Sequence, residues 1–224
     1  MFRGSLAGPD ARPGDRARAW SDSLLMDHAV FRVLWDNWAA VVPGRLYRSN
    51  HPTPARLAAA ARRYGLRTVL NLRGHRLCGS DALSREAAER LGLIHIDAPF
   101  ESRGAPHRDR ILRLAEIFRT LQEPALMHCK SGADRAGLGA GLFLLMNGGT
   151  SQQALAQLSW RFGHFNRSRT GILDAFFVRY AVEAEGRKPF LDWVRDDYDE
   201  MALRRDFVAG GLSSFIVDRV LVRE

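Results

Sequence analysis

The chain has 224 residues, 46% of them hydrophobic, and carries a formal net charge of +8 at pH 7. This length and apolar content suffice for one domain with a sizeable core. Two cysteines are too few for a disulfide framework and no apolar run is long enough to span a bilayer, which argues against a disulfide-rich secreted protein and an integral membrane protein. The first ten residues also lack the apolar centre of a signal peptide, and the expected location is therefore cytoplasmic.

The positive charge comes almost entirely from arginine, because Lys130 and Lys188 are the only lysines among the 33 basic residues. A basic chain favours anionic partners, here a phosphorylated small molecule, lipid or protein, or the surface of an acidic membrane. Nucleic acid is disfavoured, because no motif of interleaved aromatic and basic residues accompanies the charge.

The N-terminal part combines a polar arm with an amphipathic stretch. Residues 1–21 are rich in Gly, Pro, Arg and Asp, and predict a flexible arm. From Asp22 apolar residues recur at three- and four-residue steps and predict a helix, which either lies in a membrane interface or packs on the domain. We favour packing, because Asp22, Asp27 and Asp36 would be repelled by acidic lipids. The apolar stripe consists of Leu24, Leu25, His28, Phe31, Leu34, Trp35 and Trp38.

Strand and helix patterns alternate along the remainder of the chain. Thr53 is a predicted N-cap of a helix that begins at Pro54 and stops at Gly65, and Ser80 and Ser151 are predicted to cap two later helices. Strands are predicted over 45–48, 67–72, 93–97 and 125–127, and helices over 54–64, 81–91, 106–121, 138–146, 151–162, 172–185 and 190–207.

This alternation predicts an α/β fold: a single domain over residues 22–224, with a central, mostly parallel sheet flanked by helices and a mainly helical C-terminal part. Gly137, Gly139 and Gly141 predict that the helix over 138–146 is buried against its neighbours, since they would be costly in an isolated helix. No element is predicted for residues 213–224. In such sheets, ligands bind beyond the carboxyl ends of the strands.

The stretch His128-Cys-Lys-Ser-Gly-Ala-Asp-Arg-Ala-Gly137 joins the strand over 125–127 to a helix. A loop that opens a helix points several backbone N–H groups at one place, where the helix dipole also favours an anion. Cys129 at such a helix start favours the nucleophilic thiolate, and the planar fork of Arg135 suits two phosphate oxygens. The alternative for a lone cysteine after an apolar strand is a small buried hydrophobic residue.

Through His128, Cys129, Gly132 and Arg135, this loop resembles the phosphate-binding loop of the protein tyrosine and dual-specificity phosphatase superfamily. Residues 46–54 and 64–73 resemble the front half of bacterial dual-specificity-like phosphatases, so the resemblance spans about residues 44–180. It implies that the Cys129 thiolate attacks phosphorus while Arg135 and the loop hold the phosphoryl oxygens, and that water then hydrolyses the phosphocysteine. The implied substrate-binding residues are His128, Lys130, Ser131, Gly132 and Ala133.

The resemblance implies neither a metal nor another cofactor, and the seven histidines show no ligand spacing. One residue departs from the family pattern: Ala136 occupies the position of a serine or threonine whose hydroxyl helps the cysteine to leave in the second step. Slow turnover is therefore expected. His128 is expected to support the thiolate and not to act as a base.

Two aspartates are candidates for the acid that protonates the leaving group. Asp97 lies 32 residues before Cys129, a spacing similar to that of dual-specificity phosphatases, and we favour it slightly. Asp134 lies inside the loop, where the sequence resembles myotubularin-like lipid phosphatases. Glu101 and Asp109 are weaker alternatives.

The sequence therefore predicts a cysteine-dependent phosphomonoesterase acting on a phosphoinositide, an inositol phosphate, another phospholipid or a phosphoprotein. The alternative is a catalytically weak module that senses phosphate or docks on a membrane. Cys78 is either a redox partner of Cys129 or, as we favour, a plain loop cysteine. A basic loop over 163–170, which contains His164, is a candidate for lining the pocket.

Overall fold

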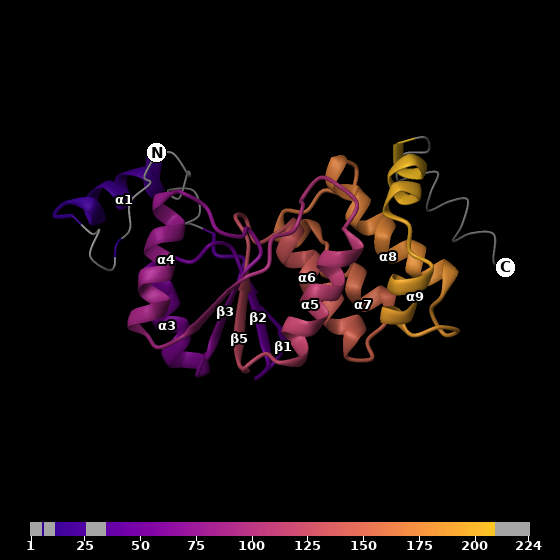
Figure 1. The fold of residues 1–224 in the computed structure, drawn as a ribbon, viewed down its shortest axis with the longest axis horizontal. Helices are drawn as coiled ribbons and strands as arrows, with labels where there is room; N and C mark the ends of the chain where they lie inside the picture. The colour runs from indigo at the N-terminus through magenta and orange to yellow at the C-terminus, as the bar shows by residue number, and fades with distance from the viewer. Residues whose placement is uncertain (1–5, 7–11, 26–34, 209–224) are drawn as a thin grey trace. The chain divides into compact units, whose positions relative to one another are not determined.

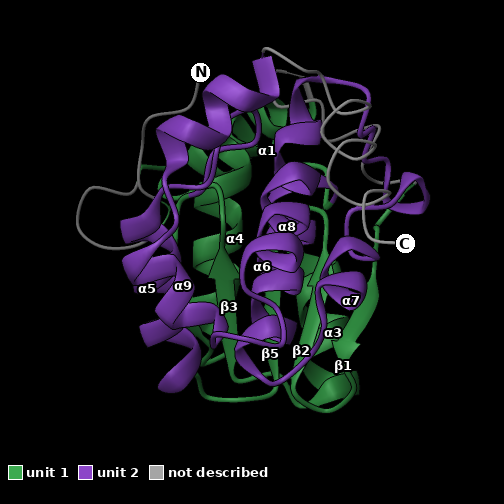
Figure 2. Cartoon of the chain, turned by 90° about the vertical axis from the view of Figure 1, so that its right-hand side faces the viewer, with its two compact units in different colours: residues 1–99, 121–132 green, residues 100–120, 133–224 purple. Residues whose placement is uncertain are grey.

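The computed structural model describes residue 6 and residues 12–25 and 35–208. The chain divides into two compact units, one made of residues 1–99 and 121–132 and the other of residues 100–120 and 133–224 (Figure 2). The first unit contains a five-stranded sheet, and the second is built from helices.

The sheet has the order β1-β2-β5-β3-β4 (Figure 1), which places β5 at its centre. Its strands are β1 Ala39–Val42, β2 Leu46–Ser49, β3 Thr68–Asn71, β4 Ile94–Asp97 and β5 Ala125–His128. β1 pairs with β2 antiparallel, while the three other pairs are parallel. The predicted α/β class and mostly parallel sheet are confirmed.

Among the described residues of the first unit, three helices accompany the sheet: α1 Asp15–Leu25, α3 Pro54–Tyr64 and α4 Gly79–Arg90. α3 begins and ends where the sequence predicts, because Thr53 accepts a hydrogen bond from the Arg56 amide and Gly65 adopts a left-handed φ of 64°. Apolar side chains of α3 and α4 pack on residues of the central strands. This core consists of Leu57, Ala60, Leu66, Ala87 and Ala88 with Tyr47, Val69 and Leu126.

The N-terminal predictions are wrong in two respects. α1 begins at Asp15, inside the predicted flexible arm, and residues 35–38 are not helical. β1 occupies residues that were assigned to the end of the predicted helix, because a turn with Gly44 at φ 76° folds the β-branched end of β1 back onto β2. Residues 26–34 of the predicted helix lie outside the described residues.

The predicted cap of α4 is also wrong, because Ser80 lies in its first turn and Cys78 is the N-cap residue. Asp22 of α1 satisfies the start of the helix by accepting a hydrogen bond of 2.7 Å from the Gly79 amide. A side chain at Gly79 would lie 1.9 Å from the carbonyl oxygen of Ala19, so α1 approaches α4 closely only because residue 79 is glycine. The described part of the predicted N-terminal helix thus packs on the protein.

The described residues of the second unit form α5 Arg108–Arg119, α6 Asp134–Met146, α7 Ser151–Leu155, α8 Ile172–Glu183 and α9 Phe190–Asp196, followed by a helical run over 200–208. α6 is buried as predicted, and a side chain at Gly141 would lie 2.5 Å from the ring of Phe177 on α8. The other side of α8 packs into a cluster of aromatic rings. This cluster consists of Phe176, Tyr180, Phe190, Trp193 and Tyr198.

Two helices of this unit are shorter than predicted. Thr150, and not Ser151, caps α7, and a separate short 3₁₀ helix over Trp160–Phe162 follows it. The helix predicted over 190–207 is interrupted, because the Asp199 carboxylate accepts hydrogen bonds from two amides of the next turn and starts a new helical run over 200–208. Residues 213–224 lie outside the described residues. Within the described ranges, no helix is long and apolar enough to cross a bilayer.

Candidate active site

Cys129 directly follows β5, between the carboxyl ends of β2 and β3, and is only 1% exposed. His128 is the last residue of β5 and is fully buried, with its ring edge-on to that of His51. The carbonyl oxygen of His128 accepts a hydrogen bond of 2.9 Å from the Leu72 amide. The central strand therefore delivers the cysteine to the edge of the sheet at which ligands bind in parallel α/β folds.

The next three residues have their carbonyl groups tied to other parts of the first unit. When the carbonyl groups of a loop accept hydrogen bonds from outside the loop, its peptide N–H groups can point toward the centre of the loop. An anion-binding loop requires this arrangement. The donors are the His51 amide, 3.2 Å from the oxygen of Lys130; Asn37 Nδ2, 2.6 Å from that of Ser131; and the Arg48 guanidinium, 2.6 Å from that of Gly132.

Gly132 has a left-handed φ of 78°, and a Cβ atom at this position would lie 2.6 Å from the Asn50 nitrogen. Only glycine satisfies both the conformation and the space. In this geometry the Gly132 amide donates a hydrogen bond of 3.2 Å to Sγ of Cys129. At least one loop amide therefore points at the sulfur, where it stabilises negative charge.

Sequence reasoning missed the residues that hold the loop. Arg48 is fully buried on β2 although it carries a charge, and Asn37 has a positive φ of 51°. The sequence shows an arginine and a serine in the strand Leu46-Tyr-Arg-Ser49, and the structure buries all four of these positions. A buried arginine in a strand requires acceptors, and here one acceptor is the loop itself.

The second half of the loop belongs to the second unit. Asp134 and Arg135 are the first two residues of α6, both partly exposed, and Ala136 is fully buried behind them. Ala133 precedes the helix and contributes no capping side chain. Lys130 is half-buried and Ser131 is exposed in the first unit.

Asp134 bonds to the buried His164, which in turn bonds to Asp174. Asp134 Oδ1 lies 2.7 Å from His164 Nδ1, and Asp174 Oδ2 lies 2.6 Å from His164 Nε2. Burial disfavours the charged ring, but the hydrogen bonds to Asp134 and Asp174 outweigh it and raise the pKa of His164 to about 9. His164 is therefore an imidazolium at neutral pH, and within the predicted basic loop over 163–170 it is buried.

Asp97, the other acid candidate, ends β4 and lies in a polar network. Both of its carboxylate oxygens accept hydrogen bonds from Arg85, at 2.8 and 2.7 Å, and Asn71 donates to Oδ1. Arg85 and Asn71 bond in the same way to Asp81, which is buried. Both oxygens of the Asp97 carboxylate are therefore taken up by hydrogen bonds within the first unit.

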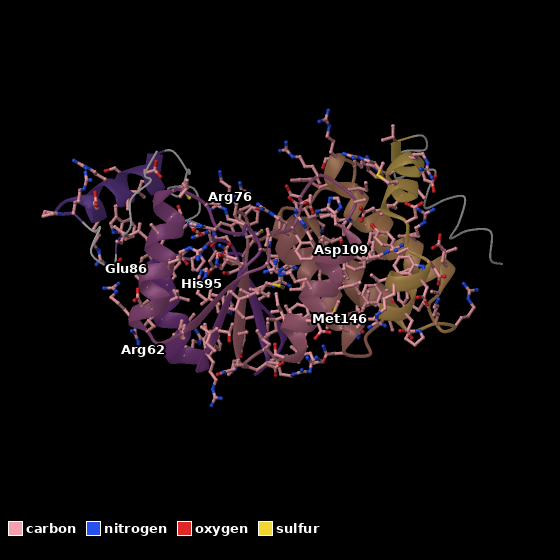
Figure 3. The ribbon with its side chains drawn as sticks, in the orientation of Figure 1. Arg62, Arg76, Glu86, His95, Asp109 and Met146 are labelled. Carbon is pink, nitrogen blue, oxygen red and sulfur yellow. The ribbon has the colours of Figure 1, made fainter. Side chains whose placement is uncertain are left out.

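The weaker candidates occupy different surroundings. Glu101 forms an ion pair with Arg110, whereas Asp109 is exposed in the first turn of α5 (Figure 3). Cys78 is buried at the start of α4, and both it and Cys129 are free thiols. Among the residues that the structure describes, no cluster of three or more His, Cys, Asp or Glu side chains is arranged to hold a metal ion.

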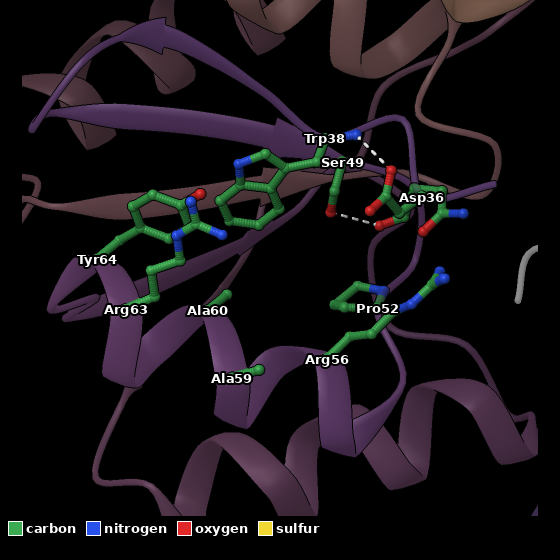
Figure 4. A pocket seen from close by; sticks show the side chains of 10 residues that line it. Asp36, Trp38, Ser49, Pro52, Arg56, Ala59, Ala60, Arg63 and Tyr64 are labelled. Carbon is green, nitrogen blue, oxygen red and sulfur yellow. Dashed lines mark hydrogen bonds between the residues drawn. The ribbon is translucent and has the colours of Figure 1, made fainter.

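A pocket of about 250 Å³ lies in the first unit beside the residues that contact the loop (Figure 4). Ser49 and Asn50 line it, and Trp38 and Tyr64 contribute stacked rings with centroids 5.0 Å apart. Arg56, Arg63 and Asp36 add charge to this otherwise apolar wall.

Comparisons with known proteins relate the loop after β5 and the fold to tyrosine phosphatases. Residues 106–157 match the sequence model of the Tyrosine phosphatase family, whereas no curated protein matches the chain. The structure of TpbA from P. aeruginosa aligns with a TM-score of 0.52 at 21% identity, over 77% of this chain and 91% of TpbA. The catalytic core of a PP-IP phosphatase from S. cerevisiae in complex with citrate aligns with a TM-score of 0.49 at 17% identity, over 79% of this chain and 93% of that one.

The TpbA alignment shows that the two chains share a fold, and the family match includes β5 and the whole Cys129–Arg135 loop. The resemblance to the protein tyrosine and dual-specificity phosphatase superfamily is thereby confirmed. Together, the two comparisons support a phosphatase of the tyrosine and dual-specificity type.

Proposed function

We propose that this phosphatase of the tyrosine and dual-specificity type is a cysteine-dependent phosphomonoesterase that acts through a phosphocysteine intermediate. The observation that carries the proposal is the loop after β5, in which the Gly132 amide donates to the Cys129 sulfur while three successive carbonyl groups are bonded outward. Such a loop is set for an anion before any ligand arrives, so little reorganisation is needed during the reaction.

In the first step, the Cys129 thiolate attacks phosphorus and the ester oxygen departs. In the second step, water attacks the phosphocysteine and releases phosphate with the thiolate regenerated. Arg135 and the loop amides hold the phosphoryl oxygens in both steps, because a planar guanidinium offers two parallel donors. His128, Lys130, Ser131, Gly132 and Ala133 complete the proposed substrate-binding loop.

For the leaving-group acid we propose Asp134. The carboxylate of Asp97 is held on both oxygens by Arg85, whereas Asp134 is held through Oδ1, and Oδ2 has no partner among the described residues. A carboxyl group that gives its proton to a substrate needs one accessible oxygen, and the Asp134 side chain is 23% exposed.

For the substrate we propose a multiply anionic phosphate ester, such as an inositol phosphate or a phosphorylated lipid headgroup. Lys130 adds a second cation to the loop, in a chain that has only one other lysine, Lys188, among its 33 basic residues. An ammonium group on a flexible stem attracts additional phosphate without fixing its geometry.

The test compares Cys129→Ser with Cys78→Ser, which removes the other free thiol. With p-nitrophenyl phosphate, wild type and Cys78→Ser should release a burst of nitrophenol and form an acid-stable phosphoenzyme, and Cys129→Ser should do neither. Inorganic phosphate should still bind to Cys129→Ser, because the amides and Arg135 remain. Turnover near that of wild type in Cys129→Ser would end the proposal.

Ala136 favours a second candidate function, a catalytically weak module that binds phosphorylated ligands. It is fully buried where the resembling enzymes carry a hydroxyl. A burst of one nitrophenol per protein followed by almost no steady turnover would identify this behaviour. A steady rate above about 1 s⁻¹, within the usual range of enzymes, would exclude it.

A further inference from the structure

Asp134, His164 and Asp174 come from three separate segments of the second unit. Asp134 opens α6, Asp174 lies in the first turn of α8, and His164 lies in the segment between α7 and α8. The His164 side chain is 1% exposed and that of Asp174 is 9% exposed. Burying an ionised imidazole costs free energy unless its N–H groups are paired, and here both nitrogens have a carboxylate partner.

The segment that carries His164 is closed by its own hydrogen bonds. The hydroxyl groups of Ser168 and Thr170 both donate to the carbonyl oxygen of Phe165, at 2.8 and 3.2 Å. A side chain at Gly171 would lie 1.9 Å from the carbonyl oxygen of Asn166, so the turn into α8 is tight. The backbone of the segment that carries His164 is therefore fixed by its own hydrogen bonds, and the imidazole ring is fixed by its two carboxylate partners.

The three charges are placed asymmetrically. Asp174 is buried and forms its ion pair with the His164 ring. Asp134 is partly exposed and bonds to the same ring through one oxygen. The basic residues of the same segment, Arg161, Arg167 and Arg169, are exposed. Asp134 from α6 and Asp174 from α8 are thus the charged groups that act on His164.

We propose that His164, backed by Asp174, is a positioning residue that holds Asp134 for proton transfer to the leaving group and from the attacking water. This inference rests on the proposed phosphatase function and extends it to two residues that do not touch the substrate. Sequence spacing relates neither residue to the loop.

Protonated Asp134 accepts a hydrogen bond at Oδ1 from His164 Nδ1–H and carries its own proton on Oδ2. When the P–O bond to the leaving group breaks, that proton moves to the ester oxygen and leaves a carboxylate, which the imidazolium 2.7 Å away stabilises. In the second step, Oδ2 takes a proton from the water that attacks phosphorus. His164 keeps both of its protons throughout.

The test measures His164→Asn on an alkyl phosphate, which needs an acid, and on p-nitrophenyl phosphate, which does not. We expect kcat on the alkyl phosphate to fall at least about tenfold, with less than about a threefold change on the aryl phosphate. His107→Asn is the matched control, since it removes a histidine that pairs with Glu200 in the same unit. Its ratio of alkyl to aryl activity should equal that of wild type.

Asp174→Asn retains the imidazole and provides a second readout. Without this carboxylate, His164 should lose its proton at lower pH, and a neutral ring stabilises the Asp134 carboxylate less. The alkaline limb of the alkyl-phosphate profile should therefore move to higher pH, while the aryl profile stays in place. The double variant His164→Asn with Asp174→Asn should be no slower than His164→Asn alone, since Asp174 acts through the ring.

Equal losses on both substrates in folded variants, or no loss on either, would overturn the inference. If His164→Asn does not fold, the alkaline limb of Asp174→Asn decides, and an unchanged limb overturns it. Turnover that survives in Cys129→Ser overturns both this inference and the proposed function. An unselective effect of His164→Asn in a cysteine-dependent enzyme overturns only the inference.

Discussion

At the scale of single residues, the contacts of Asp97 and Asp134 lead to opposite expectations. Asp134→Asn should lose on the order of 10²–10⁴-fold on an alkyl phosphate and little on nitrophenyl phosphate, because nitrophenolate departs unprotonated. Asp97→Asn should lose both activities together with thermal stability, since it leaves Arg85 with a broken ion pair. Steady-state kinetics on the two substrates, with melting curves, check this. A selective alkyl-phosphate loss in Asp97→Asn would return the acid role to that residue.

Lys130 has a natural control, because Lys188 is the only other lysine and pairs with Asp196 and Asp197 outside the loop. Lys130→Ala should lower kcat/KM on an inositol polyphosphate about tenfold more than on nitrophenyl phosphate, since it removes a charge that meets the additional phosphates. Lys188→Ala should alter neither value. Equal losses on both substrates in Lys130→Ala would mean that this side chain only supports the loop.

Ala136 leads to a prediction of increased activity. Ala136→Ser adds the hydroxyl that the resembling enzymes carry, and it should raise the steady-state rate severalfold without changing the burst, because the hydroxyl assists only the second step. Ala140→Ser is the control, since Ala140 is equally buried in the same helix. Stopped-flow release of nitrophenol separates the two phases. A faster burst in Ala136→Ser would contradict the assignment to the second step.

At the scale of elements, the loop after β5 depends on one glycine. Gly132→Ala places a methyl group against Asn50 and forces a left-handed φ, whereas Gly148→Ala has the same φ problem in open space. Gly148→Ala should therefore cost only about 1 kcal/mol of stability. Gly132→Ala should lower the melting temperature further and abolish phosphate binding. Thermal melting and phosphate titration measure both effects, and intact phosphate binding in Gly132→Ala would show that the loop tolerates displacement.

The elements that sequence reasoning predicted well have local causes. α3 has a capping threonine, a proline in its first turn and a left-handed glycine at its end, and all three act within the helix. α1 and β1 were missed because their causes are distant. α1 is supported by the contact with Gly79, and β1 depends on the hairpin with β2, neither of which has a periodic signature.

The same division holds for the site. Cys129, Gly132 and Arg135 belong to one contiguous motif, from which the sequence analysis proposed them as site residues. Asn37, Arg48 and His164 reach their partners from positions 94, 84 and 30 residues away, so no spacing rule identifies them. A buried strand that contains an arginine was the one available signal.

At the scale of the whole molecule, His164 links stability to pH. Its pKa is raised from the ordinary value of 6.5 to about 9, so the protonated ring stabilises the folded state fully below about pH 6.5, and this contribution is lost as the pH rises through about 9. Wild type should therefore lose about 3 kcal/mol at most over this interval. In His164→Asn this loss should be absent. Urea unfolding across the interval measures it, and parallel curves for the two proteins would contradict the assigned charge.

The position of β5 has a consequence for how the protein becomes active. It is the last strand among the described residues, yet it lies between β2 and β3, so the strand that joins these two is absent until residues 125–128 have been synthesised. The groups that shape the loop emerge from the ribosome long before the cysteine does. In a nascent chain, the edges of β2 and β3 are therefore unpaired, and the loop after β5 cannot form, until β5 has been inserted between them. Protection of Cys129 from an alkylating reagent would then time the closure of the sheet during synthesis.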